Sequence, residues 1–359
     1  MKAKQKFYNN PLKEDMDHVL AHTEGLWEEL RGKNIFITGG TGFFGCWFLE
    51  SFAWANEKLN LNASMIVLTR DLEAFRKKAP HLTNQPSISF HIGDVCSFDF
   101  PEGEFAYIIH AAASLSSFPK GEDSLQVFDT IVEGTRRTLA FAKQCKVNKF
   151  LLISSGAVYG QQPPEITRIC EDYQKAPNPV DWHPSYGEGK RAAELLTVLN
   201  ARQYGFEAKI ARCFAFVGPY QKLDGQWAIG NFIRDGLNGG PIVVRGDGMA
   251  YRSYLYAADL IIFLWTILFR GESCLPYNVG SEEEINISSL AELVSSVFKL
   301  KKSIVISKKP DIKADVERYV PSIKRAKGKL NLKQIINLQN AITKTIKYIE
   351  FQEGSNRYE

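Results

Sequence analysis

The sequence predicts an α/β protein, with a doubly wound parallel sheet and a smaller α/β lobe at the C-terminal end. Three observations predict this architecture. Short apolar runs alternate with helical periodicity between residues 34 and 214, which is typical of parallel strands covered by helices on both faces. A glycine-rich turn joins the first apolar run to the first helix. After residue 214 the predicted strands shorten and glycine-rich turns appear, which indicates that a separate, smaller lobe begins there.

The glycine-rich turn reads T-G-G-T-G-F-F-G over residues 38–45 and follows a strand at residues 34–37. Between a strand and a helix, such a turn points backbone N–H groups and the positive end of the helix dipole at a pyrophosphate. The alternative is a glycine-rich turn of some other α/β protein. We favour the dinucleotide-binding, or Rossmann, form of the sheet. The expected cofactor contacts are Gly39, Thr41, Gly42, Phe43, Phe44 and Gly45.

The composition argues against several classes of function. The chain has 359 residues, and its net charge of +4, from 44 basic and 40 acidic residues, is too balanced to favour nucleic acid. Six cysteines without a C-x-x-C pair indicate free thiols in a reducing compartment. No apolar signal core follows the basic N-terminus, and the longest apolar run, residues 260–269, is too short to span a bilayer. We expect a cytoplasmic protein without a metal site and without a membrane partner.

Three segments are expected along the chain. Residues 1–33 form an N-terminal extension, in which residues 17–30 predict an amphipathic helix that acts as a lid, as a dimer contact or in simple packing. Residues 34–214 form mainly the dinucleotide-binding domain. Residues 215–359 form mainly the substrate-binding lobe, with part of 250–285 returning to the first domain. Within that lobe, a serine is expected to cap a helix at residue 287, and residues 326–350 read as helical.

The second strand, residues 64–68, ends in Thr69, Arg70 and Asp71. At this place an acidic residue accepts a hydrogen bond from an adenosine ribose, whereas an arginine suits a 2′-phosphate. Thr69 stands at the usual acidic position and Arg70 follows it, which favours NADP over NAD. In the alternative reading Arg70 is a solvated loop residue and Asp71 binds the ribose.

Two later stretches carry candidate chemistry. Residues 107–113 form a buried strand that ends in small residues, and we interpret His110 within it as a core histidine. The strand at residues 150–153 opens into S-S-G-A-V-Y-G, and a loop with five prolines, residues 161–184, follows over the site. Tyr186 and Lys190 then begin a helix at i and i+4 and share one face. A nearby ammonium lowers a phenol's pKa, so Tyr186 is the expected general acid/base.

Taken together, these motifs resemble the extended short-chain dehydrogenase/reductase family, in its NAD-dependent nucleotide-sugar epimerase/dehydratase branch. The resemblance covers about residues 33–335 and rests on the motifs already quoted, on Y-G-E-G-K at 186–190, and on five further motifs. These are G-D-V at 93–95, H-A-A-A at 110–113, V-G-P-Y at 217–220, R-S-Y at 252–254 and N-V-G at 278–280.

The resemblance implies a role for each candidate residue. Asp94 and Val95 should approach the adenine, and Ala111, Ala112 and Ala113 should border the cofactor. Ser155 matches the catalytic hydroxyl, Tyr186 the base, and Lys190 its partner on the nicotinamide ribose. Arg252 resembles the residue that grips the diphosphate of a nucleotide sugar, with Arg318 and then Asn231 as weaker candidates. Relatives usually pair through two helices of each subunit, so a homodimer is expected.

The implied chemistry is oxidation of a sugar carbon, C4 by this resemblance, to a keto group, which leads to epimerisation or net 4-oxidoreduction. A 4,6-dehydratase is the alternative, but Gly156 and Ala157 stand where dehydratases carry Asp-Glu. The glutamate of the family's decarboxylases is also absent there, although Glu165 or Glu188 could substitute. Ala215 and Ile131 each replace a common asparagine. A cofactor-binding protein without catalysis is the alternative of another class, and the complete set of Ser155, Tyr186 and Lys190 argues against it.

Overall fold

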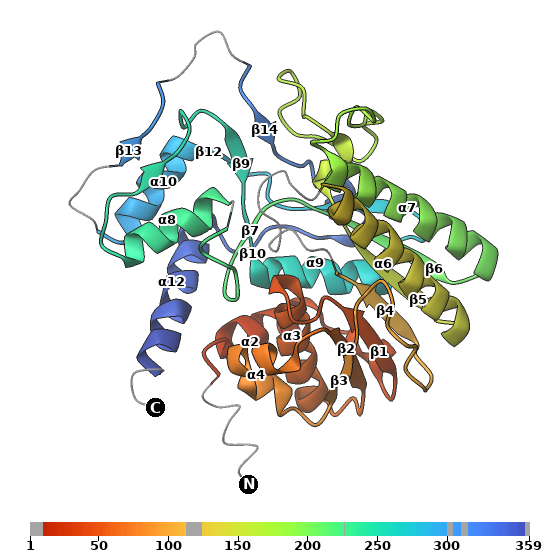
Figure 1. Ribbon diagram of the computed structural model, residues 1–359. Coiled ribbons are helices and arrows are strands. Elements are labelled where there is room, and N and C mark those ends of the chain that lie inside the picture. The colour runs from red at the N-terminus through yellow and green to blue at the C-terminus, as the bar shows by residue number, and fades with distance from the viewer. Residues whose placement is uncertain (1–9, 113–123, 226, 300–303, 310–314, 356–359) are drawn as a thin grey trace.

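The structure is a computed structural model that describes residues 10–112, 124–225, 227–299, 304–309 and 315–355. At its centre is a sheet of seven parallel strands in the order β3-β2-β1-β4-β5-β6-β11 (Figure 1). The strand order reverses between β1 and β4, and ligands bind at such a switch point in open α/β sheets. The strands are β1 (Asn34–Thr38), β2 (Ser64–Thr69), β3 (Ile88–Ile92), β4 (Tyr107–His110), β5 (Lys149–Ser155), β6 (Glu207–Cys213) and β11 (Pro276–Val279).

Helices cover both faces of this sheet, as the sequence predicts. Successive residues of a strand point to opposite faces, so each strand supplies two cores. Ile35 and Ile37 of β1 belong to the core under α3 and α9, whereas Phe36 belongs to the core under α6 and α7. The four helices are α3 (Phe43–Leu59), α9 (Ala257–Arg270), α6 (Ser124–Cys145) and α7 (Ser185–Tyr204). The fold is therefore the expected doubly wound α/β sheet.

The smaller lobe lies beyond the carboxyl ends of the strands (Figure 1). Its main sheet has β9 at the centre, antiparallel to β12 and parallel to β14. Two short parallel pairs, β7 with β10 and β8 with β13, complete its strands in the described residues. These elements are β7 (Phe216–Val217), β8 (Val243–Val244), β9 (Tyr251–Ser253), β10 (Leu255–Tyr256), β12 (Glu284–Asn286), β13 (Val305–Ile306), β14 (Arg318–Tyr319), α8 (Ala228–Leu237), α10 (Ile287–Val297), α11 (Lys324–Leu330) and α12 (Leu338–Ser355).

The chain passes between the two parts more than once. After β9 and β10 it returns to the large sheet as α9 and β11, and β11 pairs with β6 along Pro276–Val279. It then leaves again for β12 and the rest of the smaller lobe. The remaining short helices follow strands of the large sheet: α4 (Leu72–Lys78), α5 (Pro80–Thr83) and the 3₁₀ turn η2 (Gly156–Tyr159).

The N-terminal extension differs from the predicted helix at residues 17–30. It forms α2 (Lys13–His22) and then the 3₁₀ turn η1 (Trp27–Leu30). Gly25 separates them at φ +75°, a left-handed backbone conformation that ends a helix. The helix packs on α3 and α9, and Asp15 accepts hydrogen bonds from Tyr256 and Lys344. Simple packing, one of the three expected roles, is therefore present on this face of the extension.

Two expectations for the smaller lobe need correction. The helical stretch predicted at 326–350 is interrupted, because Asn331 is left-handed at φ +54° and ends α11 before α12 begins. The cap of α10 is Asn286 rather than a serine: its side-chain oxygen accepts a hydrogen bond from the amide of Ser289 at 2.7 Å.

Candidate active site

The predicted site residues of the large domain gather at the carboxyl ends of five neighbouring strands. The glycine-rich loop follows β1, and Thr69 ends β2. Asp94 comes shortly after β3, Ala111 follows β4, and Ser155 ends β5. Because all five strands are parallel, these positions share one edge of the sheet, next to the smaller lobe (Figure 1). Ala113, also expected here, lies outside the described residues.

The glycine-rich loop is shaped for a close approach of backbone. Gly39 has φ +70°, and a Cβ there would lie 2.6 Å from the carbonyl of Ala111, so no other residue fits without a shift. A Cβ at Gly45 would lie 2.3 Å from the backbone of Gly40, which brings α3 directly against the loop. Gly42 caps α3 without a side chain, so the first amides of the helix are left for another acceptor. This cradle fits the diphosphate of a dinucleotide.

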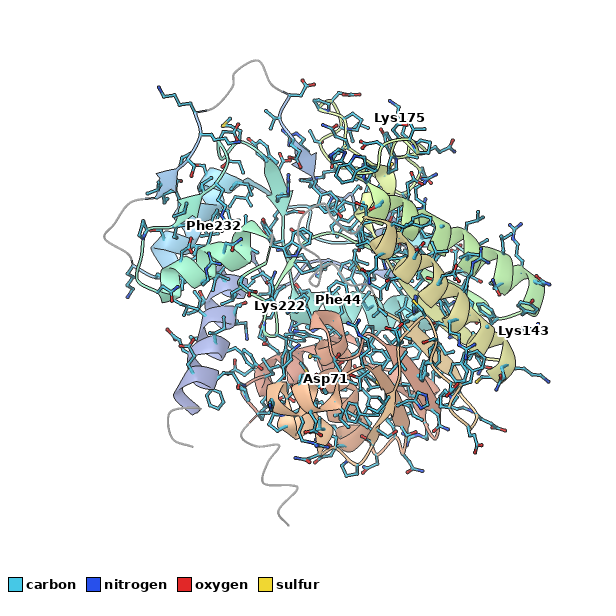
Figure 2. All side chains as sticks on the ribbon, in the orientation of Figure 1. Phe44, Asp71, Lys143, Lys175, Lys222 and Phe232 are labelled. Atoms are coloured by element: carbon cyan, nitrogen blue, oxygen red, sulfur yellow. The ribbon has the colours of Figure 1, made fainter. Side chains whose placement is uncertain are left out.

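Two further side chains border this loop. Phe44 packs edge-on against Phe216 of β7, with ring centroids 5.1 Å apart, at the junction of the two parts of the molecule (Figure 2). Lys78, at the end of α4, donates to the backbone oxygen of Thr41 at 2.9 Å. Sequence reasoning missed Lys78, because nothing in its spacing relates it to a loop 37 residues earlier. It adds a positive charge beside the predicted phosphate site.

At the tip of β2, two of the three candidate ribose-binding residues already accept hydrogen bonds from backbone amides. Thr69 is buried, and its hydroxyl accepts from the amide of Asp71 at 3.3 Å. The carboxylate of Asp71 accepts from the amide of Ala74 at 2.9 Å and caps α4. Arg70 is 68% exposed and lies 4.0 Å from Asp94. The Thr69 hydroxyl and the Asp71 carboxylate thus already accept backbone amides, whereas the Arg70 guanidinium is exposed to solvent.

His110 is a satisfied core histidine, as the sequence predicts. Its Nδ1 is 2.8 Å from the hydroxyl of Thr38, which in turn accepts from the amide of Ala112. Its Nε2 is 3.1 Å from the hydroxyl of Thr135, which itself donates to Ile131 O. These partners assign the proton to Nε2. Burial lowers the pKa of His110 to about 3, so it stays neutral and fixes the end of β4.

The three predicted catalytic residues come together. Ser155 ends β5, while Tyr186 and Lys190 lie on the first turns of α7, the helix packed beside β5. The Lys190 ammonium is 5.8 Å from the centre of the Tyr186 ring, and Ser155 lies near enough to Tyr186 to lower the pKa of its phenol. Ser155 also accepts from the amide of Ala157 at 3.1 Å. A phenol, a hydroxyl and an ammonium thus share one site.

The pKa expected for Tyr186 is wrong for this structure. Burial is the largest influence and raises the pKa of Tyr186 above its ordinary value; the neighbouring Tyr319 raises it further and the Ser155 hydrogen bond lowers it. Lys190 is itself buried, which lowers its pKa to about 8, and its Nζ donates to Ile153 O at 2.7 Å. The ammonium is therefore held by the backbone of β5, and burial of the phenol outweighs it.

Sequence reasoning missed Tyr319, whose phenol enters the site from the smaller lobe. Its hydroxyl is 3.5 Å from the hydroxyl of Ser155, and its ring packs at a tilt against Phe214 with centroids 4.7 Å apart. Burial raises the pKa of Tyr319 to about 12. No local pattern could have found it, because 164 residues separate it from Ser155.

The two candidate diphosphate arginines lie on neighbouring strands but on opposite faces. Residues paired in a parallel ladder share a face, and Arg252 pairs with Tyr319 whereas Arg318 pairs with Tyr251. Arg252 thus faces the same side as the Tyr319 phenol and is held by Glu317 at 2.6 Å. Arg318 lies over the Tyr251 ring at 4.3 Å and binds Glu284 at 2.6 Å. The structure brings Arg252, and not Arg318, to the side of Tyr319.

Asn231 lies on α8, among the elements of the smaller lobe. Its amide donates to Gly225 O at 2.9 Å and Trp227 O at 3.1 Å and so closes the preceding loop. Its side-chain oxygen is buried without a hydrogen-bond partner among the described residues. Within those residues, the hydrogen bonds tie Asn231 to this loop and not to Ser155, Tyr186 or Lys190.

Among the residues that the structure describes, no carboxylate is hydrogen-bonded or ion-paired to Ser155, Tyr186 or Lys190 in place of the missing Asp-Glu pair. Gly156 and Ala157 form the 3₁₀ turn after Ser155. Glu165 is exposed, and Glu188 lies 3.6 Å from Arg191 on the same helix. Glu194, one turn after Lys190, is bound by Arg212 at 2.7 Å and accepts from Ser154 at 2.5 Å, so it ties α7 to β5 and β6.

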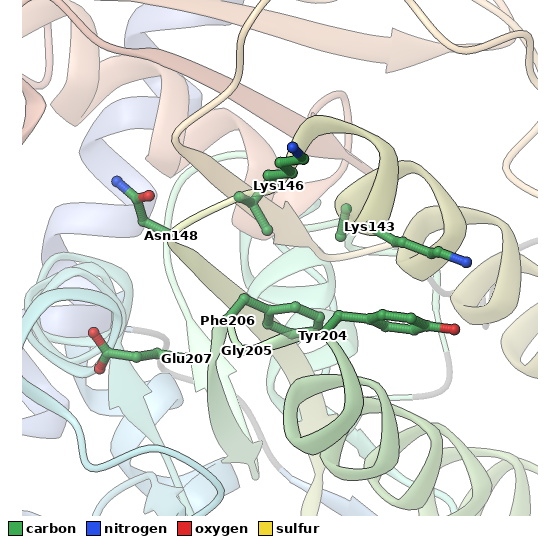
Figure 3. A pocket seen from close by; sticks show the side chains of 9 residues that line it. Lys143, Lys146, Asn148, Tyr204, Gly205, Phe206 and Glu207 are labelled. Carbon is green, nitrogen blue, oxygen red and sulfur yellow. The ribbon is translucent and has the colours of Figure 1, made fainter.

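An open hollow of about 610 Å³ lies at the other edge of the sheet (Figure 3). It is lined by the ends of α6 and α7 and by the residues that begin β5 and β6, with Lys143 4.7 Å from the Tyr204 ring. This hollow lies at the amino ends of β5 and β6, so the length of the strands separates it from the site described above.

Within the described part of the chain, no helix combines the length and apolar character needed to cross a bilayer.

Comparison with known proteins agrees with this geometry. The model of the NAD dependent epimerase/dehydratase family matches residues 35–280. The chain belongs to this family. UDP-glucuronic acid decarboxylase 1 of Arabidopsis thaliana is 30% identical over 312 residues, which are 87% of this chain and 68% of that protein. UDP-glucuronic acid decarboxylase 1 of Danio rerio is 28% identical over 330 residues, 91% of this chain and 75% of that one.

Solved structures of the family share the fold. UDP-glucose 4-epimerase of Thermotoga maritima, determined with UDP-glucose, has a TM-score of 0.74 at 22% identity and covers 89% of this chain and 99% of its own. The dTDP-glucose 4,6-dehydratase DesIV of Streptomyces venezuelae, with NAD and TYD bound, has a TM-score of 0.75 at 23% identity, over 90% of this chain and 98% of its own. At these identities the similarity establishes the fold.

Proposed function

We propose that the protein oxidises a nucleotide-diphosphate sugar at C4 to a keto intermediate and ends the reaction as an epimerase or a 4-oxidoreductase. The observation that carries this proposal is the convergence of Ser155, Tyr186 and Lys190 beside the glycine-rich loop. Two further findings support the proposal: the chain belongs to the epimerase/dehydratase family, and similar proteins are named for nucleotide sugars. Bound NAD(P) would supply a hydride acceptor at the carboxyl edge of the sheet.

Each residue has a distinct part in the proposed reaction. Tyr186 takes the proton of the sugar hydroxyl as hydride leaves the same carbon. Ser155 donates a hydrogen bond to that oxygen and stabilises the charge that develops on it. Lys190 orients the site from α7, and Arg252 binds the diphosphate, since a guanidinium matches phosphate oxygens in pairs.

Dehydration and decarboxylation are less well supported. Both need a group beyond Tyr186 that handles a proton or carbon dioxide at the neighbouring carbons, and Gly156 and Ala157 offer none. The two curated relatives described above are decarboxylases by name, so UDP-glucuronic acid belongs among the substrates to be tested.

The deciding experiment incubates the purified protein and NAD or NADP with UDP-glucose, UDP-glucuronic acid, dTDP-glucose and GDP-mannose in deuterated water. Mass and NMR spectra should give a 4-epimer or a 4-keto sugar of unchanged carbon number, without deuterium at C3 or C5. Loss of 18 mass units would favour the dehydratase, and loss of carbon dioxide the decarboxylase. Failure to convert any of the four sugars would overturn the proposal.

The proposed cofactor preference is for NADP, through Arg70. The family is NAD dependent by its description, but the tip of β2 holds an exposed guanidinium, and the nearby carboxylate of Asp71 already caps α4. A 2′-phosphate gains a charge-assisted hydrogen bond from such an arginine.

The proposed assembly is a homodimer through α6 and α7. These helices pack on each other, yet their outer surface carries exposed leucines: Leu125 is 73%, Leu195 61% and Leu199 53% exposed. Leu195 and Leu199 are four residues apart and share a helix face. An apolar stripe of this kind on a symmetric pair of helices supports a twofold, self-complementary contact.

A further inference from the structure

Glu194 lies on α7 one helical turn after Lys190, so both side chains project from the same face of the helix. Its side chain is only 12% exposed, and a carboxylate at such a depth needs partners. Arg212 of β6 supplies two of them, because its Nε donates to Oε1 at 2.9 Å and its Nη2 donates to Oε2 at 2.7 Å. Ser154 of β5 donates its hydroxyl to Oε1 at 2.5 Å. The helix of the proposed acid/base and two strands of the large sheet thus meet at one carboxylate.

The arginine that holds Glu194 is itself held by the turn after the catalytic hydroxyl. Arg212 donates from Nη1 to the hydroxyl of Tyr159 at 2.9 Å, and this hydroxyl donates to Asn278 Oδ1 at 2.8 Å. Tyr159 ends η2, the turn that begins directly after Ser155, and Asn278 belongs to β11, which pairs with β6. The carboxylate is therefore fixed in position by a continuous set of hydrogen bonds that reaches both sides of β6.

The buried ammonium of Lys190 is surrounded by groups from several elements. In the described part of the chain, the titratable groups that face it are His110 of β4, Cys213 of β6, and Tyr186 and Glu194 of α7. From α6, Ile131 packs beside Gly189. Burial lowers the pKa of Lys190 to about 8, whereas Cys213 and Glu194 raise it. Burial also raises the pKa of the Cys213 thiol, which keeps the thiol neutral. Within this group Glu194, ion-paired with Arg212, carries the negative charge.

We propose that Glu194 is a positioning residue that acts through Lys190: its carboxylate favours the buried ammonium along α7, while Arg212 and Ser154 fix the carboxylate to the sheet. This inference rests on the proposed function for the part that Lys190 plays in the site. An opposite charge one helical turn away offsets the cost of burying a cation, because it stabilises the charged form of the lysine. Loss of the charge at position 194 would therefore lower the pKa of Lys190 further and leave more of this lysine neutral at pH 7.

The first test follows the Lys190 side chain directly and needs no sugar. The full-length protein is prepared with carbon-13 in its lysine side chains, and NMR follows the Cε signal that is missing from Lys190→Arg as the pH rises. Other lysines titrate near 10.4, so a midpoint at about 8 identifies the buried residue. Glu194→Gln should lower this midpoint by about one pH unit, and Glu194→Asp, which keeps the charge, should restore most of the difference. An unchanged midpoint in Glu194→Gln, or an equally low one in Glu194→Asp, would overturn the inference.

Two further variants complete the titration. Glu207→Gln is the matched control, because Glu207 pairs with Lys209 at the opposite end of β6 and should leave the Lys190 midpoint unchanged. Should Glu194→Gln fail to fold because Arg212 is left buried without a partner, the double variant Glu194→Gln/Arg212→Met buries no lone charge and carries the same expectation. An unchanged midpoint in that double variant would overturn the inference as well.

Turnover gives the second readout. The decline of kcat/KM for the cofactor at alkaline pH should begin about one pH unit lower in Glu194→Gln than in the unaltered protein, because Lys190 loses its charge earlier. A merely structural part for Glu194 would lower stability and leave both the midpoint and this decline in place, which would overturn the inference. An unaltered protein that converts none of the four sugars would overturn the proposed function, whereas the titration alone decides whether Glu194 acts on Lys190.

Discussion

Lowering the pH should destabilise the protein through His110, and the lowered pKa of this residue gives the size of the effect. In the folded chain Nδ1 accepts from Thr38 and Nε2 donates to Thr135, so a second proton on Nδ1 would break the bond that Thr38 donates. Burial lowers the pKa of His110 from 6.5 to about 3. Between pH 7 and pH 5 the unfolded chain therefore binds a proton at this histidine and the folded chain does not. Stability falls with pH in this window by about 2 kcal/mol from this residue alone.

The assay is urea unfolding at pH 7 and pH 5 for the unaltered protein and for His110→Gln. Other titrating groups contribute equally to both proteins, so the pH-dependent change in the unfolding free energy should be smaller in the variant by about 2 kcal/mol. His183→Gln is the control, because His183 is 71% exposed and its ring nitrogen lies 2.7 Å from a carboxylate oxygen of Asp181. Equal pH dependence in the unaltered protein and in His110→Gln would refute the reasoning.

Further expected outcomes concern the catalytic residues, the cofactor and the assembly. Tyr186→Phe should lower turnover by about 10²–10⁴ while NAD(P) still binds, as single-turnover kinetics and a binding titration would report; near-full turnover would remove the acid/base role. Because the pKa of Lys190 is lowered to about 8, kcat/KM for the cofactor should decline above pH 8, and Lys190→Arg should shift that decline upward if loss of the charge is its cause. Arg70→Gln should weaken NADPH binding by about 10- to 100-fold and NADH binding by less than threefold; equal effects on both would contradict a 2′-phosphate contact. Leu199→Glu should convert a dimer to monomers in sedimentation equilibrium, whereas Leu59→Glu, at the end of α3, should not.

Features that depend on a short stretch of sequence, such as the glycine-rich turn and the Tyr186–Lys190 spacing, could be predicted. The glycine-rich turn lies between a strand and a helix, and Tyr186 and Lys190 are one helical turn apart, so their positions follow from helix and strand periodicity. His110 was interpreted correctly because a single histidine in an apolar strand is most simply a hydrogen-bonded core residue.

The rest depends on tertiary contacts that no local pattern encodes. Tyr319 meets Ser155 only because β14 is clamped to the loop after β5. The pKa of Tyr186 was predicted in the wrong direction, because the helix spacing gives the neighbour's charge but not the burial of the phenol. The break between α11 and α12 depends on one left-handed asparagine, which a basic and apolar periodicity does not reveal.

The return of the chain to its own large sheet has a consequence for synthesis on the ribosome. α9 and β11 supply one covering helix and one edge strand, yet they lie at residues 257–279, far behind the other six strands. A nascent chain released only as far as β6 would display an unpaired strand edge and the uncovered apolar residues of α3. The large sheet is therefore completed only after most of the polypeptide has emerged. Premature termination in this region would leave its edge unpaired and promote aggregation.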